Sequence, residues 1–415
     1  MKGPDPLTDL AALLPDGEAF LRTLSGPFRR AIRVHPRRGT PSGWGDLTPI
    51  PWNPGSFFTP ADCDPGDFLD YHTGTIYPQD AASQVPVLLL APQPGEVMVD
   101  TCAAPGSKST QIGIALGDEG LLVCCDSAAP RRRVLAENLS RQGITAGIVT
   151  PMPVHVLAER HPHVADGVLV DAPCSGHDAR SAKQVARMAE RQLALLNDAA
   201  RLVRGGGRLV YSTCTPYVAE NEGVIQAFLS AHPGWRVDPL ELPGCDSDRA
   251  GLGALRLWPQ RQGTEPFFAC RLRAPDDLPA HDSLRGREPT KAPLLSRWLP
   301  TSSLYCWNNG RTHFIATTAA ASCALPSEAR GLVLAHGEGG PEPWATQALI
   351  DRGALSTTVD ADVAKRLWSG ESVSLSAPAD TLVRNVTGAP LGILSGAGDL
   401  RRLSLPSRLF RANLR

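Results

Sequence analysis

Short apolar runs alternate with amphipathic segments through the middle of the chain. The apolar runs have the length of buried strands and fall at 97–101, 121–125, 147–149, 167–170 and 208–212. Helical periodicity fills the intervals, at 108–116, 130–142, 182–203 and 219–231. Such alternation predicts an α/β fold in which a mostly parallel sheet carries helices on both faces.

Punctuating residues refine this pattern. Pro130 stands where a first-turn proline is favoured, and Gly205 stands where the helix over 182–203 is expected to stop. The glycine-rich stretch 204–208 is interpreted as a helix-to-strand turn and not as a phosphate cradle. A last strand is predicted over 266–272.

The flanks differ from this core in texture. Residues 1–75 combine an amphipathic start over 7–24 with a Pro/Gly-rich stretch, and 275–292 form a polar, Pro-rich segment that we interpret as a linker. A hairpin is predicted from 304–307 and 311–316, followed by short strand-like runs. We therefore predict an N-terminal domain (1–75), a central domain (76–274), the linker (275–292) and a C-terminal β-rich region (293–415).

Composition places the chain among globular proteins of ordinary charge. Hydrophobic residues make up 42% and charged residues 20%, and the formal net charge is −1. Nucleic-acid binding would therefore depend on local basic patches. Candidates are two arginine clusters, although each could equally be a solvated face: Arg29, Arg30, Arg33, Arg37 and Arg38, and Arg401, Arg402, Arg408, Arg411 and Arg415.

Ten cysteines are scattered along the chain without the paired spacing of a zinc site. The start resembles no secretion signal, and no apolar run is long enough to span a bilayer. We therefore expect free thiols, no metal, no membrane association and a cytoplasmic location.

The segment 99–110, Val-Asp-Thr-Cys-Ala-Ala-Pro-Gly-Ser-Lys-Ser-Thr, follows the first strand directly. Small residues at the carboxyl end of a strand allow the backbone to approach a ligand closely. The segment matches neither the dinucleotide nor the triphosphate glycine pattern. Asp126 ends the second strand, where an acidic residue commonly binds ribose hydroxyls. A nucleoside-containing cofactor is predicted, the alternative being a tight turn that serves packing.

Two further strands each end in a cysteine. Val-Asp-Ala-Pro-Cys-Ser-Gly occupies 170–176, and Val-Tyr-Ser-Thr-Cys-Thr occupies 210–215, followed by Glu220-Asn221-Glu222. Since parallel strands end at the same sheet edge, Cys174 and Cys214 are expected to face the crevice of the 99–110 segment. A lone cysteine at such a place is commonly a core residue, but two that converge indicate chemistry.

Together these motifs resemble the NOL1/NOP2/Sun family of RNA cytosine methyltransferases. The resemblance covers roughly residues 70–274 and includes Gly74–Ser83 upstream, as well as the spacing of Asp126, Arg131, Asn138, Arg141 and Gly143. The flanks, including Thr48–Trp52, resemble more narrowly the bacterial 16S ribosomal RNA enzymes of the RsmF type.

The resemblance implies a Rossmann-like class I methyltransferase domain with a mostly parallel seven-stranded sheet, a small N-terminal α/β RNA-binding domain and a C-terminal PUA-like RNA-binding module. It implies S-adenosylmethionine as the methyl donor and carbon 5 of a cytidine in RNA, 16S ribosomal RNA or the small ribosomal subunit, as the target. Cys214 would attack the base, Cys174 would assist proton removal and release, and Asp171 would bind the base or cofactor. The cofactor-binding residues would be Cys102, Ala103, Ala104, Pro105, Gly106, Ser107, Lys108, Asp126, Arg131 and Asp171.

Some positions depart from the family pattern. Pro153 stands where RsmF-type relatives carry an Asp near the adenine, and His177-Asp178-Ala179-Arg180 replaces the usual sequence after Gly176. Arg131 could also be an ordinary helix-surface residue. The alternatives to a 16S enzyme are a methyltransferase for transfer RNA or another ribosomal site, and an inactive RNA-binding assembly factor on the same fold. We expect a monomer.

Overall fold

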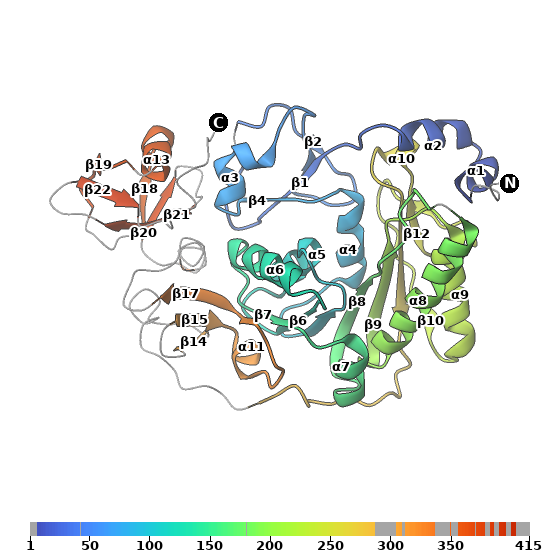
Figure 1. Cartoon of the computed structure of the whole chain (residues 1–415). Helices are drawn as coiled ribbons and strands as arrows, with labels where there is room; N and C mark the ends of the chain where they lie inside the picture. The colour runs from blue at the N-terminus through green and yellow to red at the C-terminus, as the bar shows by residue number, and fades with distance from the viewer. Residues whose placement is uncertain are drawn as a thin grey trace.

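The computed structural model describes residues 6–41, 43–179, 181–286, 304–308, 312–336, 349, 356–369, 371–377, 382–385, 390–395 and 400–403. Within these residues a ten-stranded mixed sheet forms the centre of the molecule (Figure 1). Five neighbours, in the order β7-β6-β5-β8-β9, run parallel, and β13 joins β9 antiparallel. Their bounds are β5 Val97–Asp100, β6 Leu121–Cys125, β7 Gly147–Thr150, β8 Ala165–Asp171, β9 Val203–Thr213 and β13 Phe267–Arg273.

The predicted Rossmann-like arrangement is confirmed, but the sheet is wider than the seven strands expected. Short strands extend both edges of the sheet. They are too short to produce a hydrophobic periodicity that predicts a strand. One of them, β16, comes from the predicted C-terminal region and pairs antiparallel with β7. The added strands are β10 Arg236–Val237, β11 Asp246–Ser247, β12 Leu255–Leu257 and β16 Ala329–Arg330.

Both faces of the central strands are buried, because successive side chains point to opposite sides. Val99 and Val168 pack in one apolar cluster, whereas their neighbours Met98 and Leu169 pack in the other. Helices α4, α5 and α6 cover one face, and α7, α8 and α9 cover the other (Figure 1). Their bounds are α4 Val85–Leu90, α5 Ser107–Leu116, α6 Ala129–Arg141, α7 Val154–Arg160, α8 Ala182–Ala200 and α9 Glu222–Ala231, with the short helices η2 Ala82–Gln84, η3 Val218–Glu220 and α10 Pro259–Gln262.

The prediction for the glycine-rich stretch 204–208 was wrong. Helix α8 ends at Ala200, and the stretch lies inside β9, next to a register shift against β8. A β-carbon at Gly205 would lie 2.4 Å from the Leu278 carbonyl oxygen and 2.6 Å from that of Asp276. The glycine therefore permits close approach of a distant segment and does not end a helix.

The N-terminal part forms a separate small sheet. The amphipathic stretch 7–24 is divided into two helices, α1 and α2, which pack with Trp258. A four-stranded antiparallel sheet follows in the order β2-β3-β1-β4. The bounds are α1 Pro6–Ala12, α2 Gly17–Leu24, β1 Ala31–Val34, β2 Thr48–Pro49, β3 Ser56–Phe58, η1 Pro65–Asp67, α3 Leu69–His72 and β4 Ile76–Pro78.

The N-terminal arginine cluster does not form one basic face. Arg33 is 5% exposed and donates from Nη2 to Thr110 Oγ1 at 2.7 Å, and Arg38 is fully buried and donates to the Arg141 carbonyl at 2.7 Å. These two arginines fasten the small sheet to α5 and α6. Arg29 and Arg30 remain exposed.

The described C-terminal residues are β-rich, as predicted. The hairpin of β14 and β15 is confirmed, although its turn at 309–311 lies outside the described residues. Ala316, Ala320 and Cys323 join the apolar cluster of the main sheet. Residues 287–292 of the predicted linker and Arg408, Arg411 and Arg415 also lie outside the described residues, and the PUA-like character stays a prediction. The bounds are β14 Tyr305–Asn308, β15 Thr312–Ala316, α11 Thr318–Ser322, β17 Leu332–His336, β18 Ser356–Val359, α13 Ala361–Trp368, β19 Val373–Ser374, β20 Leu382–Asn385, β21 Pro390–Ser395 and β22 Leu400–Leu403.

Candidate active site

A cavity of about 510 Å³ opens at the carboxyl ends of the parallel strands. The chain delivers a side chain to it after each of four strands: Cys102 after β5, Asp126 after β6, Asp171 at the end of β8 and Cys214 after β9. Cys174 reaches the same cavity from the loop that follows β8. This is the edge at which open parallel sheets bind ligands, so the location expected from the motifs is the location found.

The 102–108 loop contributes to the cavity unevenly. Cys102 and Ala104 line it, whereas Ala103, Pro105, Gly106, Ser107 and Lys108 do not. Ala103 instead donates its N–H to the Cys125 carbonyl, and Gly106 has a φ of +112° where the loop turns into α5. The predicted cofactor loop thus meets the cavity through its first residues, while the rest builds the turn.

Asp126 and Arg131 form the far wall of the cavity. Asp126 is 8% exposed, and one of its carboxylate oxygens accepts the N–H of Ala128 at 2.9 Å. Arg131 lies 3.4 Å from the Asp126 carboxylate and donates to the Ala104 carbonyl at 2.5 Å. Arg131 is therefore more than an incidental surface residue, because it links the loop after β5 to the carboxylate after β6.

The two thiols predicted to converge do so. The sulfur atoms of Cys174 and Cys214 are 3.3 Å apart, and both line the cavity. The hydrogen bond between them lowers the pKa of Cys174, and the same bond together with burial raises the pKa of Cys214. Because the two ionisations are coupled, the pair carries one negative charge readily and a second one only at great cost. The opposite directions of the two pKa shifts place that charge on Cys174.

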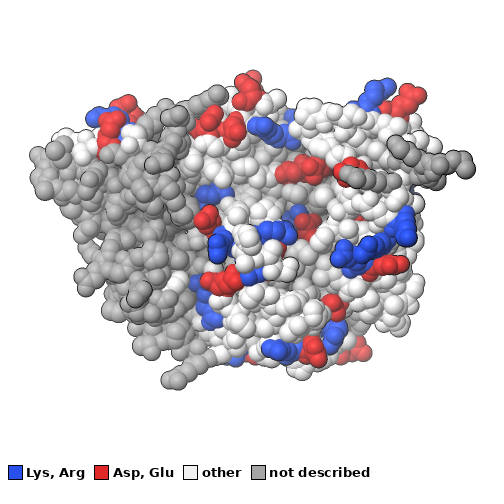
Figure 2. Space-filling model, in the orientation of Figure 1, with Lys and Arg blue, Asp and Glu red and all other residues white. Residues whose placement is uncertain are grey.

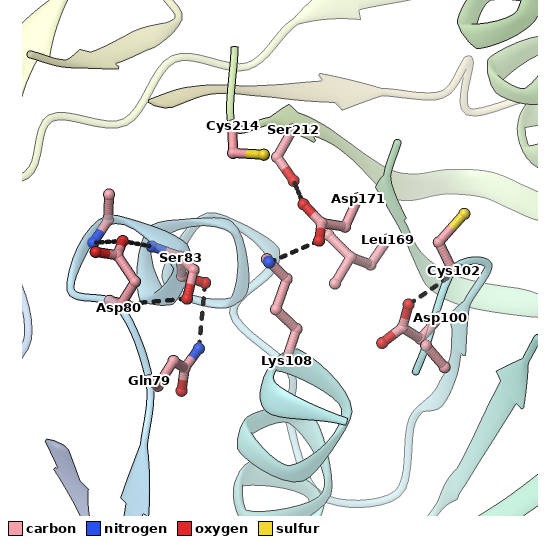
Figure 3. Close-up of polar contacts among 12 residues, drawn as sticks. Gln79, Asp80, Ser83, Asp100, Cys102, Lys108, Leu169, Asp171, Ser212 and Cys214 are labelled. Atoms are coloured by element: carbon pink, nitrogen blue, oxygen red, sulfur yellow. Dashed lines mark hydrogen bonds and ion pairs between the residues drawn. The ribbon is translucent and has the colours of Figure 1, made fainter. Parts of the chain in front are cut away.

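An ion pair between the buried Lys108 and the half-buried Asp171 lies beside Cys214, as Figure 3 shows. Lys108 Nζ lies 2.7 Å from Asp171 Oδ2, and Ser212 Oγ donates to Asp171 Oδ1 at 2.7 Å. Burial lowers the pKa of the Lys108 ammonium, but the Asp171 carboxylate, with smaller contributions from Asp100 and Cys214, raises it, and the net shift is upward. Lys108 was placed in the cofactor loop from its motif, but its side chain belongs to the thiol side of the site. Ser212 was missed, although it stands two residues before Cys214.

The third cysteine of the site is of a different kind. Burial, followed by the neighbouring Asp100 carboxyl, raises the pKa of the Cys102 thiol to about 12. Burial likewise raises the pKa of Asp100 to about 6, against a hydrogen bond from Ser109 Oγ at 2.6 Å. Cys102 is therefore a protonated wall residue and not a competing nucleophile.

The remaining wall is largely what the sequence could not assign. Pro153, which departs from the family pattern, lines the cavity beside Met152 and Val154. An apolar surface thus stands where a hydrogen-bonding side chain was expected. Leu195 and Asp198 of α8 also line the cavity and carry no motif that would have identified them. Among the described residues there is no group of His, Cys, Asp and Glu side chains able to hold a metal ion.

The described helices include none with the length and apolarity needed to cross a bilayer.

Comparison with known proteins gives a consistent result. Residues 87–273 match the family described as 16S rRNA methyltransferase RsmB/F. Ribosomal RNA small subunit methyltransferase F of Klebsiella pneumoniae is 37% identical over an alignment that covers 67% of this chain and 64% of that protein, and its counterpart in Erwinia tasmaniensis is 35% identical with 66% and 64% covered. The chain therefore spans less than two-thirds of the length of these relatives.

A methyltransferase homologue from Pyrococcus horikoshii of known structure is 26% identical, with a TM-score of 0.58 over 64% of this chain and 93% of that one. Residues 87–273, which match the family, contain the five parallel strands, the 102–108 loop and both thiol-bearing motifs. Through residues 87–273, the chain is similar to the family described as 16S rRNA methyltransferase RsmB/F.

Proposed function

We propose that this protein transfers a methyl group from S-adenosylmethionine to carbon 5 of a cytidine in RNA, through a covalent bond between Cys214 and the base. The observation that carries the proposal is the contact of 3.3 Å between two thiols in one cavity with Asp126 and the 102–104 loop. One thiol suffices for attack on a pyrimidine. A second thiol beside it indicates a reaction with a later proton transfer.

The walls of the cavity suit the methyl donor. The buried Asp126 carboxylate at the end of β6 fits ribose hydroxyls, and the apolar surface of Met152, Pro153 and Val154 fits a purine ring. When bound, S-adenosylmethionine supplies an electrophilic methyl group. Arg131 would keep the two walls at a fixed separation through its contacts with Ala104 and Asp126.

Cys214 acts as the nucleophile in this scheme. Carbon 5 of cytosine is a weak nucleophile, and a thiolate added to carbon 6 moves electron density onto carbon 5. The new sulfur–carbon bond forms as the ring double bond shifts, and carbon 5 then takes the methyl group. The Cys174–Cys214 pair can supply the thiolate because it loses its first proton readily.

Release requires removal of the proton on carbon 5 and cleavage of the bond to Cys214. Cys174 is the side chain placed for the proton transfer, since its sulfur lies beside the sulfur that leaves. Once Cys214 is bonded to carbon 6, Cys174 gives up its own proton to solvent and becomes a thiolate. The carbon 5 proton then passes to this thiolate, the ring double bond re-forms and Cys214 departs as a thiolate. Two thiols sharing one charge therefore match the two halves of the reaction.

Asp171 lines the cavity and binds the polar edge of the base, whereas Lys108, which does not line it, acts from behind Asp171. A carboxylate accepts a hydrogen bond from an exocyclic amine, and a buried ammonium stabilises negative charge that develops on the ring. Both groups are fixed in advance, Asp171 by Ser212 and Lys108 by Asp171 itself. Electrostatic preorganisation of this kind is typically worth about 3 kcal/mol.

The substrate class follows from the relatives, which are named as small-subunit ribosomal RNA methyltransferases, and from the N-terminal unit. A base in folded RNA must leave its stack to reach the two thiols, and contacts to the RNA backbone offset that cost. On the face in Figure 2, basic and acidic side chains are interspersed, so backbone contacts must be local. A second cavity of about 460 Å³ is the candidate site for them: Arg29 and Arg30 line it, together with Asp64, Asp80 and Glu265. In Figure 3, Asp80 and Cys102 lie on opposite sides of Lys108.

The proposal is tested with the purified full chain. Titration calorimetry with S-adenosylmethionine is expected to show binding, and incubation with unmodified small-subunit ribosomal RNA is expected to give 5-methylcytosine detectable by bisulfite sequencing. Cys214→Ala should bind the methyl donor with unchanged affinity and form no product. Binding without methylation of ribosomal or transfer RNA by the unaltered protein would indicate an assembly factor instead.

A further inference from the structure

The motif Glu220-Asn221-Glu222 lies outside the cavity, and all three side chains are at most 1% exposed. It follows Cys214 by six residues and spans the end of η3 and the start of α9. Buried polar side chains persist only where hydrogen bonds compensate for lost hydration. The partners of these three side chains therefore indicate what the motif does.

Glu220 holds both sides of Cys174. Its Oε2 accepts the Ser175 N–H at 3.1 Å, and its Oε1 accepts the Ser175 hydroxyl. Gln192 of α8 donates from Nε2 both to Glu220 Oε2 at 2.7 Å and to the Pro173 carbonyl at 2.9 Å. The residues before and after Cys174 are thus tied to one buried carboxylate.

Asn221 does the same for Cys214. Its Oδ1 accepts the Thr213 hydroxyl at 2.5 Å, and its Nδ2 donates to the Thr215 carbonyl at 2.8 Å. Glu220 thus accepts two hydrogen bonds from the Cys174 loop, and its neighbour Asn221, in the same turn, accepts one from the Cys214 loop and donates one to it. The Tyr211 hydroxyl donates to the Glu220 carbonyl at 2.6 Å and anchors that turn to β9.

Glu222 has a different task. It forms a fully buried ion pair with Arg256, at 2.6 and 3.0 Å, and touches neither cysteine loop. Arg256 also donates to the Pro216 carbonyl. The pair fixes the turn to β12, and Glu222 provides a control within the same motif.

We propose that Glu220 and Asn221 are positioning residues that set the separation of the two sulfur atoms, Glu220 by holding Cys174 and Asn221 by holding Cys214. This rests on the proposed function for its catalytic consequences but not for its geometry. Loss of Glu220 displaces the thiol that removes the proton, and loss of Asn221 displaces the thiol that attacks. Two adjacent substitutions should therefore block opposite halves of the reaction.

The catalytic test compares Glu220→Gln with Asn221→Ala. Glu220→Gln should retain attack and methyl transfer but accumulate RNA covalently bound to the protein, seen as a shifted band on a denaturing gel. Asn221→Ala should form little adduct and lose about 100-fold in methyl transfer, the scale that follows a misplacement of about 1 Å. Gln192→Met removes the two hydrogen bonds that the Gln192 amide donates to Glu220 and to the Pro173 carbonyl. If Glu220→Gln folds poorly, Gln192→Met is expected to accumulate the same adduct. Glu222→Gln should lower the melting temperature without selectively impairing either methyl transfer or release of the RNA.

A second readout needs neither RNA nor methyl donor. Full-length variants are treated with iodoacetamide, and alkylation at Cys174 and Cys214 is followed by mass spectrometry across pH. Glu220→Gln and Gln192→Met should change the rate and its pH profile at Cys174 more than at Cys214, and Asn221→Ala should do the reverse. Equal changes at both cysteines in every variant overturn the positioning roles. If the variants show the selective changes in alkylation but the unaltered protein does not methylate RNA, the proposed function is overturned and the positioning roles stand.

Discussion

At the residue scale, the site depends on which of several buried thiols can ionise. Burial and nearby carboxyl groups raise the pKa of Cys102 to about 12, whereas the hydrogen bond between Cys174 and Cys214, 3.3 Å apart, lowers the pKa of Cys174 and raises that of Cys214. The same cavity thus contains one inert thiol and one reactive pair. Their identity as cysteines says nothing about this difference, which comes from the neighbours of each sulfur.

Replacing the second thiol tests the division of roles. Cys174→Ala should still let Cys214 attack and take up a methyl group, but the carbon 5 proton would lack an acceptor and release would be slow. Methylated RNA should therefore remain attached to the protein on a denaturing gel. The double variant Cys174→Ala with Cys214→Ala should give no attached RNA. Normal turnover without an adduct would make Cys174 a structural thiol.

Asp100 should leave a signature in the dependence of stability on pH. Burial raises its pKa to about 6 from an ordinary 3.8, so the folded state holds a proton that the unfolded state has released between these values. Stability from this group therefore falls as pH rises from about 4 to about 6, by about 3 kcal/mol in total. Asp100→Asn should lower the slope measured in denaturant titrations by this contribution and leave that of Asp80, whose pKa burial also raises to about 6. The exposed Asp277→Asn should keep the full slope. A slope that is unchanged in Asp100→Asn contradicts the assignment.

At the element scale, strand β9 joins the site to the rest of the sheet. It runs from Val203 to Thr213, so the same strand begins among the glycines at 205–207 and ends one residue before Cys214. The 275–279 segment crosses close over its beginning, where Gly205 and Gly206 donate to the Pro279 and Pro275 carbonyls. The packing at the start of β9 therefore contributes to the placement of the nucleophile at its end.

Gly205→Ala should disturb that packing. The added methyl group would lie 2.4 Å from one backbone carbonyl oxygen and 2.6 Å from another, neither of which can rotate away. Overpacking of this kind lowers the free energy of unfolding by about 1–3 kcal/mol, and urea denaturation would measure the loss. Gly26→Ala is the matched control, because its nearest neighbour is 3.7 Å away. Equal stability of the two variants would show that the 275–279 segment yields easily.

At the scale of the whole molecule, chain segments far apart in sequence complete the central domain. Strand β16 extends the sheet beside β7, and Arg132 of α6 pairs with Glu328 at 2.6 Å. On the opposite side, Arg33 and Arg38 fasten the N-terminal sheet to α5 and α6. The small N-terminal sheet and the central domain thus present Arg29, Arg30, Asp80 and Glu265 around one cavity.

The role of this cavity in RNA binding has a measurable consequence. If Arg30 neutralises one phosphate, Arg30→Ala should weaken RNA binding and reduce the slope of log affinity against log salt by about 1. Binding of S-adenosylmethionine should be unchanged. Arg201→Ala, an exposed arginine at the end of α8, serves as the control. An unchanged salt slope in Arg30→Ala would place the RNA elsewhere.

The sequence by itself determined the order of strands and helices in the central domain and the convergence of Cys174 and Cys214. Both follow from local rules: apolar periodicity selects the element, and parallel strands bring their carboxyl ends to one edge. The motifs also indicated the family. The position of Lys108 beside Asp171, the wall from α8 and the burial of Arg33 and Arg38 could not be predicted in this way.

Only the tertiary structure decided those features, because each depends on atoms that are distant in the chain. The sequence predicted a helix end at Gly205, but the structure places residues 276 and 278 against it. Strand β16 has only two residues, too few for a pattern that predicts a strand. Hydrogen-bond partners and burial, and with them the pKa values of Cys102 and Asp100, are set by packing between elements. Periodicity along one segment carries no information about that packing.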